Sequence, residues 1–275
     1  MTVCIAALAD LGKSLVLVCD SRLSAGEVSG DRAANKMFPL SDQFQWWAMV
    51  SANDITQVPS VLDAVVHSLF RVSDSTNTAA IVERCVLEAY MAIRMRYAAD
   101  LVLSPIGFTV ERFLANSERH PDLKEKLSAV DLGCELLVAG FDFAGDGFIF
   151  TVEHPGDVRS HTFAGWASIG SGANEAINSL LRHSVNYTME LPRVLWHACQ
   201  SKFRAELSEG VGRHTVVKVA DGAGKMDAYE ASEALIDNIR GAWERGGAAA
   251  SGWVIGRLQS ELERHPGLHK GDNEN

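Results

Sequence analysis

The chain has 275 residues, of which 47% are hydrophobic and 22% charged, and this composition suits a globular protein with a sizeable core. Its formal net charge of −10, without a block rich in lysine or arginine, argues against a surface for nucleic acid or anionic membranes. No window reaches the roughly 20 apolar residues of a membrane span, and the N-terminus lacks the basic start of a signal peptide. Five widely spaced cysteines without a CxxC motif favour reduced thiols, so we expect a cytoplasmic protein.

The first half of the chain is predicted to contain two pairs of strands followed by helices. Runs of β-branched and apolar residues predict the strands, and a change to helical periodicity predicts the helices. The predicted elements are strands at 2–9, 15–19, 36–40 and 45–51, a polar loop at 24–35, and helices at 59–70, 78–103 and 110–127, the last broken near Pro121.

The second half repeats the order of strands followed by helices. Its predicted elements are strands at 135–141 and 147–153, helices at 174–183 and 191–207, a strand at 214–220 and an amphipathic segment at 253–262. This order favours an α+β fold, a four-layer αββα sandwich of two antiparallel sheets between helical layers, over a parallel βαβ fold. We assign 1–240 to this domain, with a helical insertion at about 98–131, and 241–275 to a partly helical extension with a disordered end.

The residues that carry chemistry lie in the first fifty positions. Thr2 follows the initiator Met1, the second predicted strand ends at Asp20, and Lys36 stands 16 residues further on at the head of the next strand. A threonine hydroxyl is a weak nucleophile, but the free α-amine of an N-terminal threonine can accept its proton. A nearby cation keeps that amine neutral, and a carboxylate holds the cation. Lys36 and Asp20 are therefore the residue types that an active Thr2 needs.

These motifs resemble those of the proteasome β-subunits and their bacterial relatives, including the Anbu type. Residues 20–26 read Asp-Ser-Arg-x-Ser-x-Gly, and the spacing from Asp20 to Lys36 matches that family. The opening Met-Thr-Val-Cys-Ile-Ala-Ala and the segment 132–140 are similar to a further prokaryotic group of proteasome-like proteins. The resemblance covers most of residues 2–220. It implies an N-terminal-nucleophile hydrolase that acts as a threonine peptidase or a related amidohydrolase.

The resemblance also implies roles for single residues. Thr2 is the nucleophile once Met1 is removed, Lys36 tunes the hydroxyl and amine, and Asp20 holds Lys36. Ser171 matches the serine near the active amine, and Ser208 is a weaker match to a second serine. Backbone N–H groups near Val50 and Ser51 would stabilise the oxyanion. No metal or cofactor is expected, and the partners are a peptide or small amide substrate and further copies of the chain in a ring or related oligomer. The sequence leaves the substrate, the ring size and any unfoldase partner open.

Three departures from the family pattern keep other interpretations open. The first hairpin carries two extra residues, so Cys4 falls at the nucleophile position if the insertion is ignored. Val50 stands where the family has a glycine, and Ala205, with Glu206 beside it, stands where the family has an acid. An inactive assembly or scaffold subunit with the same fold is therefore the alternative function.

Two other kinds of site are disfavoured by the sequence. Gly170, Ser171 and Gly172 precede a predicted helix but lack the third glycine of a dinucleotide fingerprint, so a tight turn is the better interpretation. His265 and His269 are four residues apart in the polar tail, with a proline and a glycine between them, which disfavours a helical zinc site.

Overall fold

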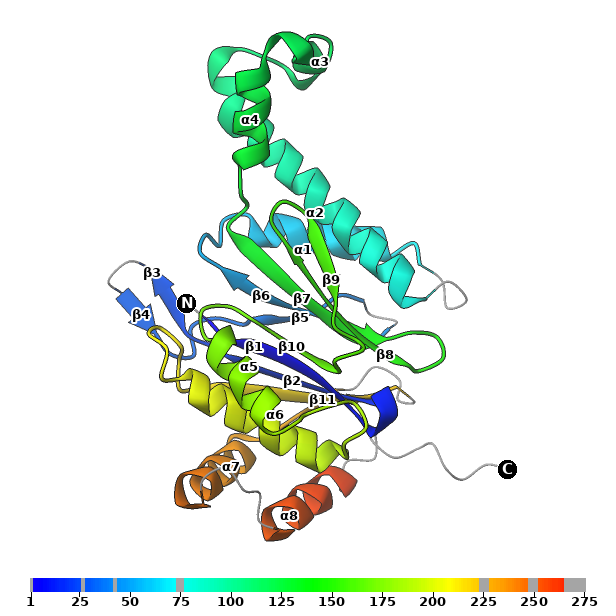
Figure 1. Ribbon diagram of the computed structural model, residues 1–275, viewed down its shortest axis with the longest axis vertical. Coiled ribbons are helices and arrows are strands. Elements are labelled where there is room, and N and C mark those ends of the chain that lie inside the picture. The colour runs from blue at the N-terminus through cyan, green and yellow to red at the C-terminus, as the bar shows by residue number, and fades with distance from the viewer. Residues whose placement is uncertain are drawn as a thin grey trace.

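The computed structural model describes residues 2–25, 28–41, 44–72, 77–222, 228–246 and 252–264 (Figure 1). Its centre is a pair of five-stranded antiparallel sheets. The first sheet has the order β10 (Trp166–Ile169), β1 (Cys4–Ala9), β2 (Ser14–Asp20), β11 (Thr215–Asp221) and β12 (Tyr229–Glu230). The second has the order β5 (Met37–Pro39), β6 (Trp46–Ala52), β7 (Cys134–Phe141), β8 (Gly147–Glu153) and β9 (Asp157–Ser160). A small hairpin of β3 (Leu23–Ala25) and β4 (Val28–Gly30) lies beside them.

Helices cover the outer face of each sheet. The helices on the second sheet are α1 (Val58–Leu69) and α2 (Ala79–Val102), and those on the first are α5 (Ala173–Arg182) and α6 (Leu191–Ala205). Two further helices, α7 (Glu233–Gly246) and α8 (Gly252–Glu263), pack outside α6. This arrangement confirms the predicted αββα sandwich. Within the described residues, no helix is both long and apolar enough to cross a membrane.

Strand β1 of the first sheet is apolar throughout because both of its faces are buried. In β1, Ile5 and Ala7 pack toward α6, whereas Ala6 and Leu8 pack between the sheets. A strand buried on both faces reads as a continuous apolar run, which is why this strand could be predicted. The core thus fixes both ends of β1, including the end that carries Thr2.

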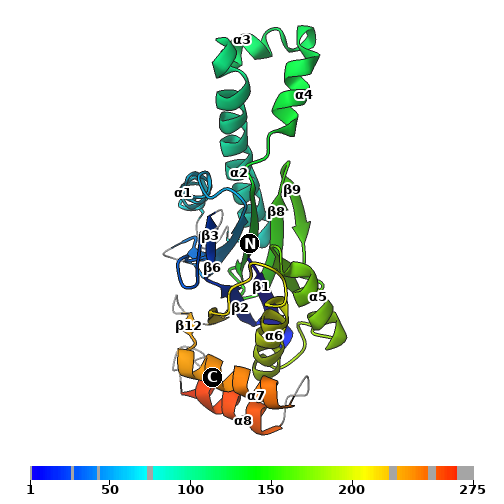
Figure 2. The ribbon, with the colours of Figure 1, turned by 90° about the vertical axis from the view of Figure 1, so that its left-hand side faces the viewer.

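The C-terminal half of α2 projects beyond the sandwich. It continues into short helical segments, which are η3 (Ser104–Ile106), α3 (Val110–Leu114), η4 (Ser117–Arg119) and α4 (Pro121–Ala129). Leu103, Phe113 and Leu123 form a small separate core there. Figures 1 and 2 place this projection at one end of the molecule and α7 and α8 at the other. The residues of the predicted insertion at 98–131 form this projection.

Several short elements were not predicted. β9 and β10 have four residues each and lie in a segment whose turn residues predicted no strand. β10 pairs with β1 and forms one edge of the first sheet. α7 begins after Ser232, whose hydroxyl accepts the N–H of Leu235 at 3.3 Å as a helix cap does. The predicted boundary at residue 240 falls inside α7, whose apolar residues join the core beneath α6. The tail at 265–275 lies outside the described residues.

The contact between α5 and α6 leads to a prediction about acid stability. The ring of His197 is 8% exposed, stacks on His183 at 4.6 Å between ring centroids, and shares a 3.3 Å hydrogen bond with Gln200. Burial lowers the pKa of His197 to about 4. The unfolded chain therefore binds a proton at higher pH than the folded chain, and stability is lost as the pH falls from about 6.5 to about 4.

We expect this loss to be about 3 kcal/mol, since each pKa unit corresponds to about 1.4 kcal/mol. His197→Gln should remove most of it, as measured by urea unfolding at pH 7 and pH 4.5. The same substitution at the more exposed His67 on α1 serves as the control for the loss of a histidine side chain. Equal acid sensitivity in the wild type and in His197→Gln would contradict the prediction.

Candidate active site

Thr2, Asp20 and Lys36 meet where β1 begins and β2 ends. Antiparallel pairing of the two strands brings Asp20 opposite the start of the chain, with its N–H bonded to the Val3 carbonyl at 3.2 Å. The Thr2 hydroxyl donates to Asp20 Oδ1 at 3.0 Å, and Lys36 Nζ donates to the same oxygen at 2.9 Å. Lys36 Nζ also donates to Thr2 Oγ1. The structure thus brings together the three residues that the motif predicted.

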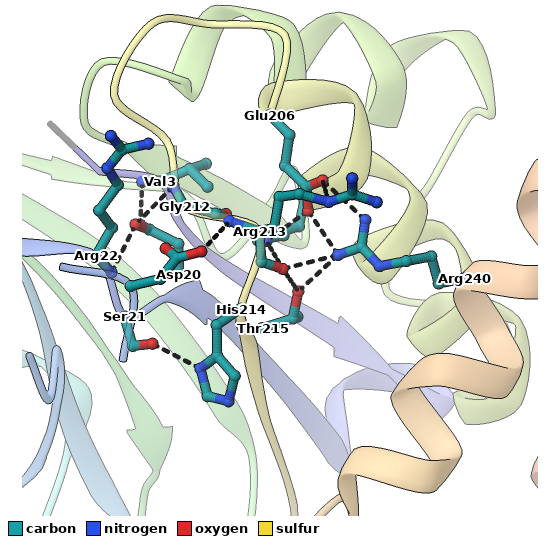
Figure 3. A network of polar contacts seen from close by, with 12 residues as sticks. Val3, Asp20, Ser21, Arg22, Glu206, Gly212, Arg213, His214, Thr215 and Arg240 are labelled. Carbon is teal, nitrogen blue, oxygen red and sulfur yellow. Dashed lines mark hydrogen bonds and ion pairs between the residues drawn. The ribbon is translucent and has the colours of Figure 1, made fainter. Parts of the chain in front are cut away.

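The carboxylate of Asp20 is fully buried and holds a fixed position. Besides Thr2 and Lys36, Oδ1 accepts the N–H of Val3 at 2.9 Å, while Oδ2 accepts the N–H groups of Arg22 and Gly212, each at 3.1 Å (Figure 3). A buried carboxylate is tolerated where a cation and several N–H donors compensate its lost hydration. Asp20 therefore serves as a rigid anion that orients Lys36 toward Thr2.

The turn between β10 and α5 holds the backbone of Thr2. The N–H of Thr2 donates to Ser171 Oγ at 3.1 Å, and its carbonyl accepts from the Ser171 hydroxyl at 3.3 Å and from the N–H of Gly172 at 3.1 Å. Gly170 has a φ of +94°, and a Cβ there would lie 2.6 Å from Thr2 Cγ2. Glycine is needed at position 170 because of its positive φ and because a side chain there would clash with Thr2. The turn therefore holds Thr2 in position.

Ser208 has no such contact. It lies in the turn after α6, where its N–H donates to the Ala205 carbonyl at 2.9 Å and its carbonyl accepts from Val211 at 3.3 Å. Among the hydrogen bonds of the described chain, none joins Ser208 to Thr2 or Ser171. Glu206 faces away as well, toward Lys202 on α6. A role for Ser208 beside the amine stays a prediction.

The predicted oxyanion donors need correction. The N–H of Val50 already donates to the Lys36 carbonyl at 3.1 Å, and the N–H of Asn53 donates to the Gly133 carbonyl at 2.8 Å. Backbone N–H groups alternate between the two edges of a strand. The N–H of Ser51 therefore points toward β7, and the N–H of Ala52 points toward the side of Lys36. The N–H of Val50 is therefore taken up within the sheet, a donor role for Ser51 stays a prediction, and the N–H of Ala52 is directed to the edge beside Lys36.

The thiol of Cys4 is poorly suited to be the nucleophile. Cys4 is fully buried in β1 opposite Cys19, and its Sγ lies 3.8 Å from the Val50 carbonyl oxygen. The hydrogen bond with Cys19 and burial raise its pKa well above the usual range. Since the thiolate is the reactive form of cysteine, this environment favours Thr2 over Cys4.

A second acidic side chain lies near the Thr2 turn and was missed in the sequence. The carboxylate of Glu135, on β7, accepts the N–H of Gly170, and burial together with Glu153 raises its pKa. No motif could have found Glu135, because it occupies an ordinary strand position.

A pocket of about 280 Å³ opens beside Thr2 and Lys36. Apolar side chains make up much of its lining, and these are Leu23, Ala34, Phe38, Val50, Ala52, Ile55 and Val58. Asn35 and Asn53 add amide groups, and Arg22 and Asp54 add charges. In the part of the chain that the structure describes, no group of three or more His, Cys, Asp or Glu side chains could hold a metal ion. His265 and His269 lie outside that part.

Two antiparallel sheets between helical layers give the chain a proteasome-like sandwich fold. Among solved structures, the chain is similar to Anbu (ancestral beta-subunit) from Yersinia bercovieri, with a TM-score of 0.63 and 16% identity over 98% of this chain and 100% of that chain. It is also similar to the Anbu (Gly-1) mutant from Hyphomicrobium sp. strain MC1, with a TM-score of 0.62 and 14% identity over 96% of this chain and 98% of that chain. The predicted resemblance to Anbu-type proteins is thereby confirmed at the level of the fold. No family model and no curated protein sequence matches the chain.

Proposed function

We propose that this protein is an amide or peptide hydrolase whose nucleophile is Thr2, made N-terminal by cleavage of the Met1–Thr2 bond. One observation carries the proposal: Lys36 Nζ donates at once to Thr2 Oγ1 and to the buried Asp20, beside a pocket that Thr2 lines. A fixed cation at the hydroxyl lowers the cost of forming an alkoxide. On the resemblance to proteasome β-subunits, the proposal includes self-association into a ring or a related oligomer.

The reaction follows from these contacts. Thr2 Oγ1 attacks the carbonyl carbon of the substrate amide, and the α-amine of Thr2 takes the hydroxyl proton. The proton then passes to the leaving nitrogen as the C–N bond breaks, which leaves an ester on Thr2. Water hydrolyses the ester, with the amine again as the base. Ser171 orients the amine, because its hydroxyl lies 3.1 Å from the nitrogen of Thr2.

The same geometry supports a substrate preference. The N–H of Ala52 points to the edge of β6 that faces Lys36, two residues beyond the pair formed by Val50 and Lys36. This position suits a donor to the oxyanion. The apolar walls around Phe38 and Val58 suit an apolar substrate side chain beside the scissile bond. We therefore expect peptides with an apolar residue at that position to be cleaved in preference to those with an acidic one.

Intact mass spectrometry tests the nucleophile. The protein isolated without Met1 is treated with a peptide β-lactone, which transfers an acyl group to an activated hydroxyl. We expect a single adduct whose fragments locate it on Thr2, and an unchanged result for Thr188→Ala, which alters an exposed threonine far from the site in the sequence. Absence of any adduct on protein that has lost Met1 would contradict the proposal.

An inactive assembly subunit is the second candidate, and two observations favour it. Thr2 is only 3% exposed, and the side chain of Val50 lines the pocket where the family has a glycine. In that case the Asp20–Lys36 pair is a structural ion pair at the strand ends. The protein without Met1 would then stay unmodified by the β-lactone although its fold and oligomeric state were intact.

A further inference from the structure

A cluster of three charged side chains contacts the same stretch of backbone as Asp20. Lys202, on α6, is fully buried, and its Nζ donates to the carbonyls of Gly212 at 2.7 Å and Arg213 at 2.9 Å and to Glu206 Oε1 at 2.6 Å. Burial lowers the pKa of Lys202, whereas Glu206 opposes that shift. A buried cation with all three donors bonded holds its partners in one arrangement.

Arg240 closes this cluster from α7. Its guanidinium bonds both oxygens of Glu206, at 2.8 and 2.7 Å, and also the Arg213 carbonyl at 2.8 Å (Figure 3). It lies 4.1 Å above the ring of Phe203, and the side chains of Arg240 and Glu206 are only 14% and 11% exposed. A two-pronged contact of this kind fixes orientation as well as distance. We call Lys202, Glu206 and Arg240 the charge clamp.

The charge clamp forms hydrogen bonds with the same short stretch of backbone that contacts Asp20. Its carbonyl contacts are on Gly212 and Arg213, and the N–H of Gly212 donates to Asp20 Oδ2 at 3.1 Å. Gly212 allows this approach because a Cβ would lie 2.6 Å from Arg22 Cβ and 3.2 Å from Asp20 Oδ2. A small shift of this backbone would therefore alter one of the contacts that hold Asp20 in place.

We propose that Lys202, Glu206 and Arg240 are positioning residues for the reaction of Thr2, because they set the Gly212 N–H against Asp20 and so keep Lys36 at the Thr2 hydroxyl. The inference rests on the proposed function. It makes the docking of α7 a condition for reactivity. Because none of the three residues lines the pocket, they should affect the rate of acylation and leave substrate binding unchanged.

The test compares Arg240→Ala and Arg240→Lys with Arg245→Ala, an exposed arginine on the same helix. The rate of acylation by the peptide β-lactone at saturation and its half-saturating concentration are measured separately, at a temperature where circular dichroism shows every variant folded. Hydrogen–deuterium exchange of residues 208–215, resolved to Gly212 by fragmentation, is measured on the same samples. This second measurement needs no activity.

We expect Arg240→Ala to lower the saturating rate about tenfold, with the half-saturating concentration within about twofold, since small misplacements of reacting groups cost large factors in rate. Exchange at Gly212 should become about tenfold faster, because the amide loses its fixed acceptor. Arg240→Lys should recover part of both effects, since it keeps the charge with fewer donors. Arg245→Ala should match the wild type.

Each other outcome is decisive. Unchanged exchange at Gly212 in Arg240→Ala would overturn the claim that the charge clamp holds this backbone. Faster exchange with an unchanged acylation rate would overturn its role in reactivity. A wild type that never reacts would remove the proposed function and with it the catalytic part of this inference, while the exchange data would still decide whether the clamp holds Gly212.

Discussion

Thr2→Ala is expected to abolish acylation by the peptide β-lactone and hydrolysis of amide substrates, to below about one thousandth of the wild-type rate. Alanine is as readily exposed by removal of Met1 as threonine, so the α-amine and its contact with Ser171 remain and only the hydroxyl is lost. The fold should survive, because the loss of one donor to Asp20 costs about 1 kcal/mol. Intact mass after exposure to the probe, together with thermal unfolding, measures both effects.

Thr2→Ser is the matched variant. It keeps the hydroxyl but removes the methyl group that packs beside Gly170 and fixes the side-chain rotamer. We expect the adduct to form more slowly than in the wild type but at the same residue. Acylation of Thr2→Ala at the wild-type rate would place the nucleophile elsewhere, and mapping the modified peptide would identify it.

Lys36→Met is expected to have the second largest effect. Methionine has a similar length but no charge, so Thr2 loses the cation at its hydroxyl and the acylation rate should fall about 1000-fold, within the range of general acid–base effects. The same change leaves the buried Asp20 carboxylate without its cation, which should lower the free energy of unfolding by about 3 kcal/mol. Single-turnover acylation and urea unfolding measure the two losses separately.

A double variant separates the two effects. Asp20→Asn with Lys36→Met removes both charges, so the unpaired buried carboxylate is gone, but the Asn NH2 group then faces the N–H of Val3 or those of Arg22 and Gly212, so only part of the stability should return. Activity should stay at the level of Lys36→Met, because the cation is still absent. If the double variant regained activity along with stability, Lys36 would be structural and the proposed chemistry would be wrong.

The sequence predicted the members of the site better than their contacts. Thr2, Asp20 and Lys36 stand at predicted strand ends with a recognisable spacing, and the structure brings them together. The prediction that the N–H of Val50 donates to the oxyanion was wrong. Counting residues from Lys36 locates a position on the strand, but it does not tell to which edge of the strand the N–H at that position points. That edge depends on the pairing with Lys36, which only the structure shows.

The charge clamp lay beyond sequence reasoning for a different reason. Lys202 and Glu206 are four residues apart on a helix end, which reads as an ordinary surface ion pair. Glu206 is paired by α7, a helix that starts at an unrecognised cap and brings Arg240 to it from 34 residues away. The long helix α2 was predicted because apolar residues recur along it at helical spacing.

The contacts of Asp20 and Thr2 have a consequence for the order of events as the chain folds. Gly212 reaches Asp20 across 192 residues of sequence, and Ser171 reaches Thr2 across 169. Contacts between such distant segments form late, because the chain between them must first be ordered. Under the proposed chemistry, a growing chain therefore carries its threonine without a working active site until β11 is in place. Under that chemistry, the chain does not attack neighbouring proteins during its own synthesis.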